Sequence, residues 1–80
     1  MKIKLKYFAS FRDMTGKQEE SMNVEEGVTV KELRDQVREK YPKIGEREMI
    51  LVAVNGVFTS LDKEISEGDE VALFPPVSGG

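Results

Sequence analysis

One amphipathic segment, from Val30 to Tyr41, constrains the fold of this 80-residue chain more than any other feature. Thr29 and Glu32 have the spacing of a capping box, which predicts where a helix begins. Pro42 predicts where it ends, because the residue before a proline avoids helical backbone angles. A single helix cannot bury its own apolar stripe, so the rest of the chain must supply a surface that covers it. The stripe consists of Val30, Leu33, Val37 and Tyr41.

The remaining patterns predict strands. Lysines alternate with apolar residues near the start of the chain, which is the period of a half-buried strand. The apolar run from Met49 to Val54 predicts a strand that is buried on both faces. Asn55 and Gly56 suit a tight type I′ hairpin turn, since both central positions of that turn need positive φ. The predicted strands cover residues 2–8, 17–24, 49–54, 57–60 and 70–74.

Two short segments have features of single helical turns. Ser10 as a capping residue, Asp13 three positions later and Gly16 at the end predict one such turn. Residues 62–66 form a connector that could make another. Five strands in a mixed sheet, with one main helix across one face, give an α+β fold. This is the β-grasp arrangement of ubiquitin-like proteins, and we expect it to cover residues 1–74, with residues 75–80 as an extended, flexible tail.

Composition excludes several kinds of chemistry. The sequence contains no cysteine and no histidine, so it offers no thiolate nucleophile, no disulfide and no imidazole base. A formal net charge of −3 argues against binding to nucleic acid. The longest apolar run is too short to span a bilayer, and the N-terminus has no apolar signal-peptide core. We therefore expect a cytoplasmic protein that binds no membrane, no metal and no resident cofactor.

The last six residues, Pro75-Pro76-Val77-Ser78-Gly79-Gly80, carry the most specific signal. The two prolines fix φ and favour a stiff, extended segment. The two glycines have no Cβ atom, so a narrow channel can close around their backbone. The carboxylate of Gly80 becomes a good acyl donor only after activation, and condensation with ATP would give a reactive acyl-adenylate.

Three segments together resemble a known family, namely residues 68–80, residues 7–16 and residues 52–56. They are similar to the MoaD family of ubiquitin-like sulfur carriers, which are small subunits of molybdopterin synthase. The resemblance implies that an E1-like, MoeB-like enzyme adenylates Gly80 with ATP, and that a sulfur donor converts it to a thiocarboxylate. It also implies that the tail enters a MoaE-like large subunit, where the sulfur passes to cyclic pyranopterin monophosphate.

The resemblance assigns the reacting group to Gly80 and partner binding to the segment before it. Phe58 joins this set because an exposed apolar patch would help two enzymes to grip the carrier, although a partly buried core position explains Phe58 equally well. With no cysteine or histidine, the chain is expected to be a co-substrate and not a catalyst. The predicted partner-binding residues are Phe58, Phe74, Pro75, Pro76, Val77, Ser78 and Gly79.

Other functions share the same tail and stay open at this point. The activated glycine could be joined to lysines of other proteins, as in a ubiquitin-like modifier. The same chemistry could serve a different sulfur pathway, such as thiazole synthesis or tRNA thiolation, although the Pro-Pro-Val spacing fits a thiazole carrier less well. A plain binding module with no tail chemistry is a third class.

Overall fold

The computed structural model describes residues 1–47 and 49–76. The helices and strands follow one another along the chain in an order that matches the predicted pattern, with one additional short helix. The elements are β1 (Lys2–Tyr7), α1 (Ser10–Thr15), β2 (Glu19–Asn23), α2 (Val30–Lys40), α3 (Pro42–Gly45), β3 (Leu51–Val54), β4 (Val57–Phe58) and β5 (Glu70–Phe74).

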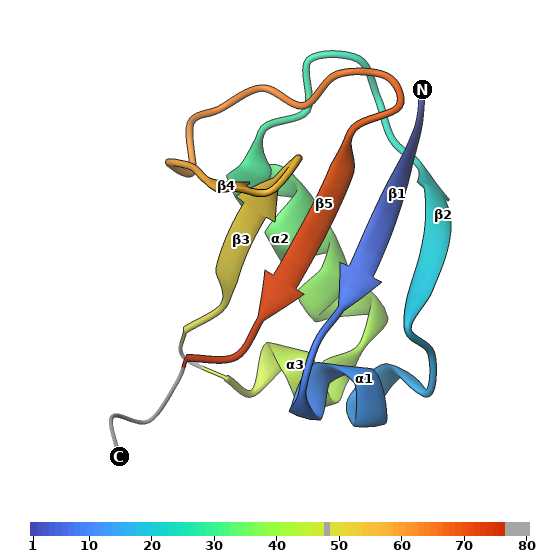
Figure 1. Ribbon diagram of the computed structural model, residues 1–80, viewed down its shortest axis with the longest axis vertical. Coiled ribbons are helices and arrows are strands. Elements are labelled where there is room, and N and C mark those ends of the chain that lie inside the picture. The colour runs from blue at the N-terminus through green and yellow to red at the C-terminus, as the bar shows by residue number, and fades with distance from the viewer. Residues whose placement is uncertain (48, 77–80) are drawn as a thin grey trace.

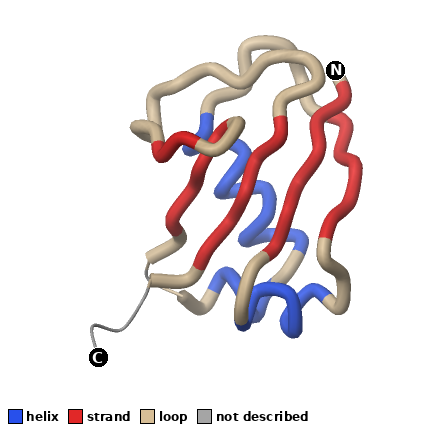
Figure 2. Tube along the Cα trace, in the orientation of Figure 1, coloured by secondary structure: helices blue, strands red, loops and turns tan. Residues whose placement is uncertain are grey.

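The strands form one mixed sheet in the order β2-β1-β5-β3-β4. The first and last strands, β1 and β5, run parallel at its centre, and the other pairs are antiparallel. Helix α2 crosses one face of this sheet, and α1 and α3 lie together at one end (Figure 1). The long connection between β4 and β5 passes over the opposite end (Figure 2). The predicted β-grasp fold is confirmed.

The core lies between α2 and the sheet. Side chains alternate across a strand, so Ile3, Leu5 and Tyr7 of β1 face the helix while the lysines between them face away. On α2, the stripe residues Val30, Leu33 and Val37 are buried, and Tyr41 packs at its margin. Val71 and Leu73 of the central strand β5 are fully buried beneath them. The face opposite α2 carries no helix from the described part of the chain, and this open face holds the site described below.

The ends of α2 agree with the prediction. The side-chain oxygen of Thr29 accepts a hydrogen bond from the amide of Glu32 at 3.2 Å, and the Glu32 carboxylate accepts one from the amide of Thr29 at 3.1 Å. Tyr41 leaves the helical region with φ −123° and ψ 91°, as a residue before proline should. Pro42 then opens α3, which was not predicted from the sequence.

Helix α3 depends on a close approach to α2. A Cβ atom on Gly45 would lie 2.8 Å from the carbonyl oxygen of Arg38, so only glycine fits there without a shift. The guanidinium of Arg38 donates hydrogen bonds to the carbonyl oxygens of Gly45 and Arg47, at 3.3 and 2.8 Å. Ile44 of α3 is fully buried in the core. This tertiary contact forms a helical turn between α2 and β3, in a segment for which the sequence predicted no helix.

Four local predictions were wrong, and one of them is the strand predicted at residues 57–60, which ends at Phe58. The capping position of α1 is Ala9, and no side chain caps that helix, so Ser10 is its first residue. Residues 62–66 form no helical turn, and α3 supplies the second short helix instead. The strand predicted to begin at Met49 begins at Leu51, where its pairing with β5 starts. Met49 is 55% exposed and lies outside the strand.

The hairpin between β3 and β4 has the predicted turn. Asn55 and Gly56 adopt φ values of 50° and 83°, which the type I′ geometry requires. Within residues 1–47 and 49–76, no helix is long and apolar enough to cross a membrane.

Candidate functional site

The root of the tail lies at one corner of the sheet. Phe74 ends β5 and pairs with Leu51, the first residue of β3, and the chain leaves the sheet there through Pro75 and Pro76. Figure 1 shows this departure beside the lower end of β3. The predicted tail residues Val77, Ser78, Gly79 and Gly80 lie outside the described residues, so their roles stay predictions.

Three phenylalanines gather at this corner. Phe8 stacks on Phe74 with ring centroids 4.5 Å apart and an interplanar angle of 14°. Phe58 contacts the same ring at 5.7 Å in a tilted arrangement. Phe58 is 65% exposed, so the open choice between a surface and a core position is decided in favour of the surface. We call Phe8, Phe58 and Phe74 the aromatic cluster.

The aromatic cluster lies on the open face of the sheet. Phe74 alternates with the buried Leu73 and therefore points away from α2. Phe58 pairs with Ala53, and Ala53 pairs with Ala72, so two small residues continue the same face toward the centre of the sheet. Exposed apolar side chains that gather in one place commonly mark a surface for another protein.

Phe8 was missed as a site residue. A signal was present, because Phe8 follows Lys6 at the two-residue spacing of the outward-facing positions of β1. An aromatic residue at an outward position stands out only when a neighbouring strand is known to place a second ring beside it. That neighbour is β5, which is distant in sequence and parallel to β1.

A hollow of about 640 Å³ adjoins the tail root on its other side. Its walls come from the start of α1, the segment before β3 and the first tail residues. Glu46 and Arg47 give it charges of both signs, and the exposed Met49 gives it an apolar surface. The lining residues are Ser10, Glu46, Arg47, Met49, Pro75 and Pro76.

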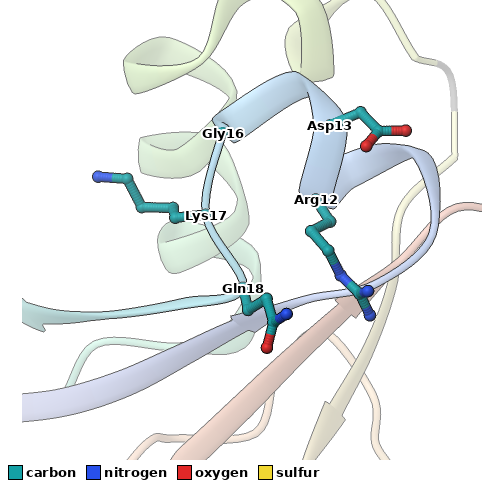
Figure 3. A pocket seen from close by; sticks show the side chains of 5 residues that line it. All are labelled: Arg12, Asp13, Gly16, Lys17 and Gln18. Atoms are coloured by element: carbon teal, nitrogen blue, oxygen red, sulfur yellow. The ribbon is translucent and has the colours of Figure 1, made fainter.

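A second hollow, of about 440 Å³, lies beside the end of α1 and has no arrangement suited to chemistry. Figure 3 shows that the side chains of Arg12, Asp13, Lys17 and Gln18 point in different directions and do not converge on a common point. Gly16 completes the lining as the left-handed end of α1. All five residues are exposed, so this hollow is an ordinary surface depression.

The two ionisable groups with the largest pKa shifts, Tyr7 and Glu20, contact each other away from the tail. The carboxylate of Glu20 accepts hydrogen bonds from the hydroxyls of Tyr7 and Tyr41 and, at 2.8 Å, from the ammonium group of Lys40. Burial raises the pKa of Glu20, but these hydrogen bonds outweigh it and lower that pKa to about 2. Burial, together with the Glu20 carboxylate, raises the pKa of the Tyr7 hydroxyl.

The Glu20 group is structural in character. It joins β2, β1 and the end of α2 through hydrogen bonds from Tyr7, Tyr41 and Lys40 to the Glu20 carboxylate. Among the described residues, no cluster of three or more acidic side chains could hold a metal ion. The chemistry predicted for this chain therefore depends on the tail and on the surface at its root.

The fold and the exposed corner place this protein in the class of ubiquitin-like β-grasp proteins. More particularly, the chain belongs to the ThiS family, whose model matches residues 5–80. It is 33% identical to the molybdopterin synthase sulfur carrier subunit of Mycobacterium tuberculosis, over 100% of this chain and 99% of that relative. The family resemblance predicted from the sequence is confirmed.

Solved structures agree on the fold. A protein from Pyrococcus furiosus, provisionally described as molybdopterin converting factor subunit 1, superposes with a TM-score of 0.89 at 36% identity, covering 96% of this chain and 99% of that one. The small archaeal modifier protein 1 of Haloferax volcanii superposes with a TM-score of 0.83 at 27% identity, covering 95% and 98%. The relatives thus include proteins named as sulfur carriers and a protein named as a modifier.

Proposed function

We propose that this chain carries sulfur as a thiocarboxylate on Gly80 and delivers it to cyclic pyranopterin monophosphate within molybdopterin synthase. The observation that carries the proposal is the family match, which runs through the whole tail to position 80. The name of the Mycobacterium tuberculosis relative, a sulfur carrier subunit of this synthase, supports the same function. The name of this relative favours sulfur carriage over conjugation to lysines.

The proposed charging reaction has two steps. The Gly80 carboxylate attacks ATP, which forms an acyl-adenylate and releases pyrophosphate. A sulfur donor then supplies the equivalent of hydrosulfide, which displaces AMP and leaves a thiocarboxylate. After the sulfur has moved to the pterin, water restores the carboxylate, and the carrier can be charged again.

The chain must receive most of this chemistry from partners. It has no cysteine to supply sulfur and no histidine to move protons near neutral pH. An E1-like enzyme would bind ATP and activate Gly80, and a large synthase subunit would bind the pterin. Neither step needs a cofactor held by this chain.

The aromatic cluster and the tail root are the surface that both partners would grip. Phe58 is exposed, and Phe74 leads directly into Pro75 and Pro76. A partner that covers the two rings would start the stiff proline segment in a defined direction. The predicted partner-binding roles of Phe58, Phe74, Pro75 and Pro76 are therefore part of this proposal, and Phe8 is added to them.

The test is to charge the protein in vitro with its E1-like enzyme, ATP and a sulfur donor. Cleavage after Lys63 releases residues 64–80, a peptide without methionine. That point matters because oxidation of any of the four methionines changes the intact mass almost as much as replacing oxygen by sulfur does. The proposal expects one oxygen of Gly80 to be replaced by sulfur, and an unchanged peptide would contradict it.

A matched control separates carriage from conjugation. The same charged protein is incubated with the large synthase subunit and, in parallel, with a cell extract. Carriage predicts dithiolene formation and a return of the Gly80 carboxylate. Gly-Gly remnants on lysines of other proteins, without dithiolene formation, would instead assign the tail to protein modification.

A further inference from the structure

Methionine provides all the side-chain sulfur of this chain. The sequence has four methionines and no cysteine. A two-electron oxidant such as hydrogen peroxide reacts with thiolates and with thioethers, and the side chains here offer thioethers alone. Because the four thioethers are chemically alike, exposure to solvent decides which of them reacts first.

The four methionines differ in exposure. Met49 is 55% exposed. The other three are partly buried and pack against the hydrophobic core, namely Met1, Met14 and Met22. Met49 is therefore the methionine that a dissolved oxidant reaches most easily.

The backbone is fixed on both sides of Met49. Two residues before it, the carbonyl oxygen of Arg47 accepts a hydrogen bond from the guanidinium of Arg38 at 2.8 Å. Two residues after it, Leu51 pairs with Phe74, the last residue of β5. These contacts place Met49 at the corner of the sheet where the tail begins (Figure 1).

The Met49 side chain borders the tail itself. It lines the hollow of about 640 Å³ together with Pro75 and Pro76, the first two residues of the tail. A partner that receives the tail has to pass close to these prolines, so it would cover this wall of the hollow. A flexible thioether suits such a contact, because methionine adapts to the shape of an apolar partner surface.

We propose that Met49 is a site of reversible oxidation that controls binding of the large synthase subunit at the tail root. Hydrogen peroxide transfers one oxygen atom to the thioether, so that an S–O bond forms, the O–O bond breaks and water leaves. The sulfur loses two electrons, which the peroxide gains. Covering the polar sulfoxide with an apolar partner surface costs free energy that the thioether does not cost. This inference rests on the proposed function, since it names the same partner.

The reverse reaction needs a separate enzyme. A methionine sulfoxide reductase returns the thioether, and the sulfoxide oxygen leaves as water. A pair of thiols supplies the two electrons and becomes a disulfide. The chain has no thiol side chain, so this reductant comes from outside. Oxidation would thus stop delivery of sulfur without destroying the carrier.

The first measurement locates the oxidation. The uncharged chain is treated with limiting hydrogen peroxide, so that no thiocarboxylate sulfur competes for the oxidant. Trypsin cleaves after arginine and lysine and yields residues 13–17, 18–31 and 48–63, each with one methionine. We expect residues 48–63 to gain one oxygen before the other two peptides do. An added oxygen that is missing from all three peptides would place the oxidation on Met1.

The second measurement compares binding before and after oxidation. Peroxide is removed, and the affinity for the large synthase subunit is measured for the treated and the untreated chain. We expect oxidation to weaken binding about tenfold, the effect of covering one polar group that has no hydrogen-bond partner. Treatment with a methionine sulfoxide reductase should restore the affinity.

Two leucine variants assign the effect to one residue. Met49→Leu has no thioether at the tail root, so we expect peroxide not to change its affinity. Met22→Leu is the matched control, which removes a thioether from the core and should still lose affinity about tenfold on oxidation. Met49→Gln places a polar amide at the exposed position, and it should weaken binding without peroxide and without lowering the melting temperature.

Four results would refute the proposal. Oxidation of Met1, Met14 or Met22 before Met49 would remove the selectivity. Loss of affinity by oxidised Met49→Leu would assign the effect to another residue. Equal affinity with and without the sulfoxide at Met49 would show that the large subunit does not cover this side chain, while the proposed function would stand. A chain that is charged with sulfur but does not bind the large subunit would contradict the proposed partner, and both proposals would fail.

Discussion

Ala9 carries backbone strain at the turn that leads into α1. Its φ of 51° and ψ of −130° lie in a region that glycine occupies readily and other residues avoid. The turn is closed by a hydrogen bond from the amide of Phe11 to the carbonyl oxygen of Phe8, at 3.0 Å. Phe11 is fully buried, and Phe8 stacks on Phe74. The packing of these rings on both sides of Ala9 balances the strain.

Replacing Ala9 with glycine should therefore stabilise the protein. We expect Ala9→Gly to raise the free energy of unfolding by about 1 kcal/mol, because relief of strain exceeds the added entropy of the unfolded chain. Urea denaturation measures the change. Ala72→Gly is the control, since Ala72 lies inside β5 and its replacement should lower stability by about 1 kcal/mol. A lower free energy of unfolding for Ala9→Gly would contradict the claim that the backbone at Ala9 is strained.

Glu20 should make stability depend on acid. Its pKa in the folded protein, about 2, lies below the ordinary value of 4.5, so the ionised carboxylate favours the fold. This contribution is complete above about pH 4.5 and is lost as the pH falls toward 2. The shift corresponds to about 3 kcal/mol, so Glu20→Gln should flatten the dependence of unfolding free energy on pH in that range.

The neighbouring carboxylate provides the control for this experiment. Glu19 is about half exposed and contacts Lys4 at 3.7 Å across the open face. Glu19→Gln makes the same chemical change one residue earlier and should alter the acid dependence little, because exposed ion pairs contribute little. Equal slopes for the two variants would show that the Glu20 hydrogen bonds do not stabilise the fold.

At the scale of elements, α2 owes its start to local sequence. The capping box of Thr29 and Glu32 satisfies two amides that a helix leaves free. We expect Thr29→Ala to lower the free energy of unfolding by about 1 kcal/mol, measured in urea. Thr59→Ala is the matched control, because within the described ranges the Thr59 hydroxyl bonds to the carbonyl oxygen of the adjacent Ser60 and caps no helix. An equal loss in both variants would argue against the cap.

The elements differ in how well local sequence predicted them. The alternation of β1, the stripe of α2 and the Asn55-Gly56 turn are short-range patterns, and each was predicted correctly. The α3 helix was not predicted, because it depends on the contact of Gly45 with the carbonyl oxygen and the guanidinium of Arg38, which α2 provides. The predicted strand at residues 57–60 was also too long, because β4 has only two residues. Strand length depends on pairing and not on composition alone.

At the scale of the whole molecule, the body and the tail should be separable. We expect deletion of Gly79 and Gly80 to leave the melting temperature unchanged, because the buried core residues of the described chain run from Ile3 to Leu73. We expect the same deletion to abolish charging with sulfur, because it removes the proposed reacting group. Calorimetry and mass spectrometry of residues 64–78 measure the two effects. Replacing Phe58 with serine is the opposite case: it keeps the Gly80 carboxylate, and we expect it to weaken binding to both partners, because Phe58 is an exposed part of the aromatic cluster.

Two results would contradict these expectations. If the shortened chain unfolded at a lower temperature, the tail would contribute to the fold, and loss of charging would no longer point to chemistry at Gly80. If Phe58→Ser bound the large subunit as well as the unaltered chain does, the aromatic cluster would not be a partner surface.

Local sequence alone determined the class of fold, the main helix and its cap, the hairpin turn and the predicted chemistry of the tail, because each depends on residues within a few positions of one another. The tertiary structure decided what those residues could not. It brought Phe8 onto Phe74 across parallel strands from opposite ends of the chain, and it exposed Phe58. These features depend on which strands become neighbours, and burial of the sheet against α2 sets that order.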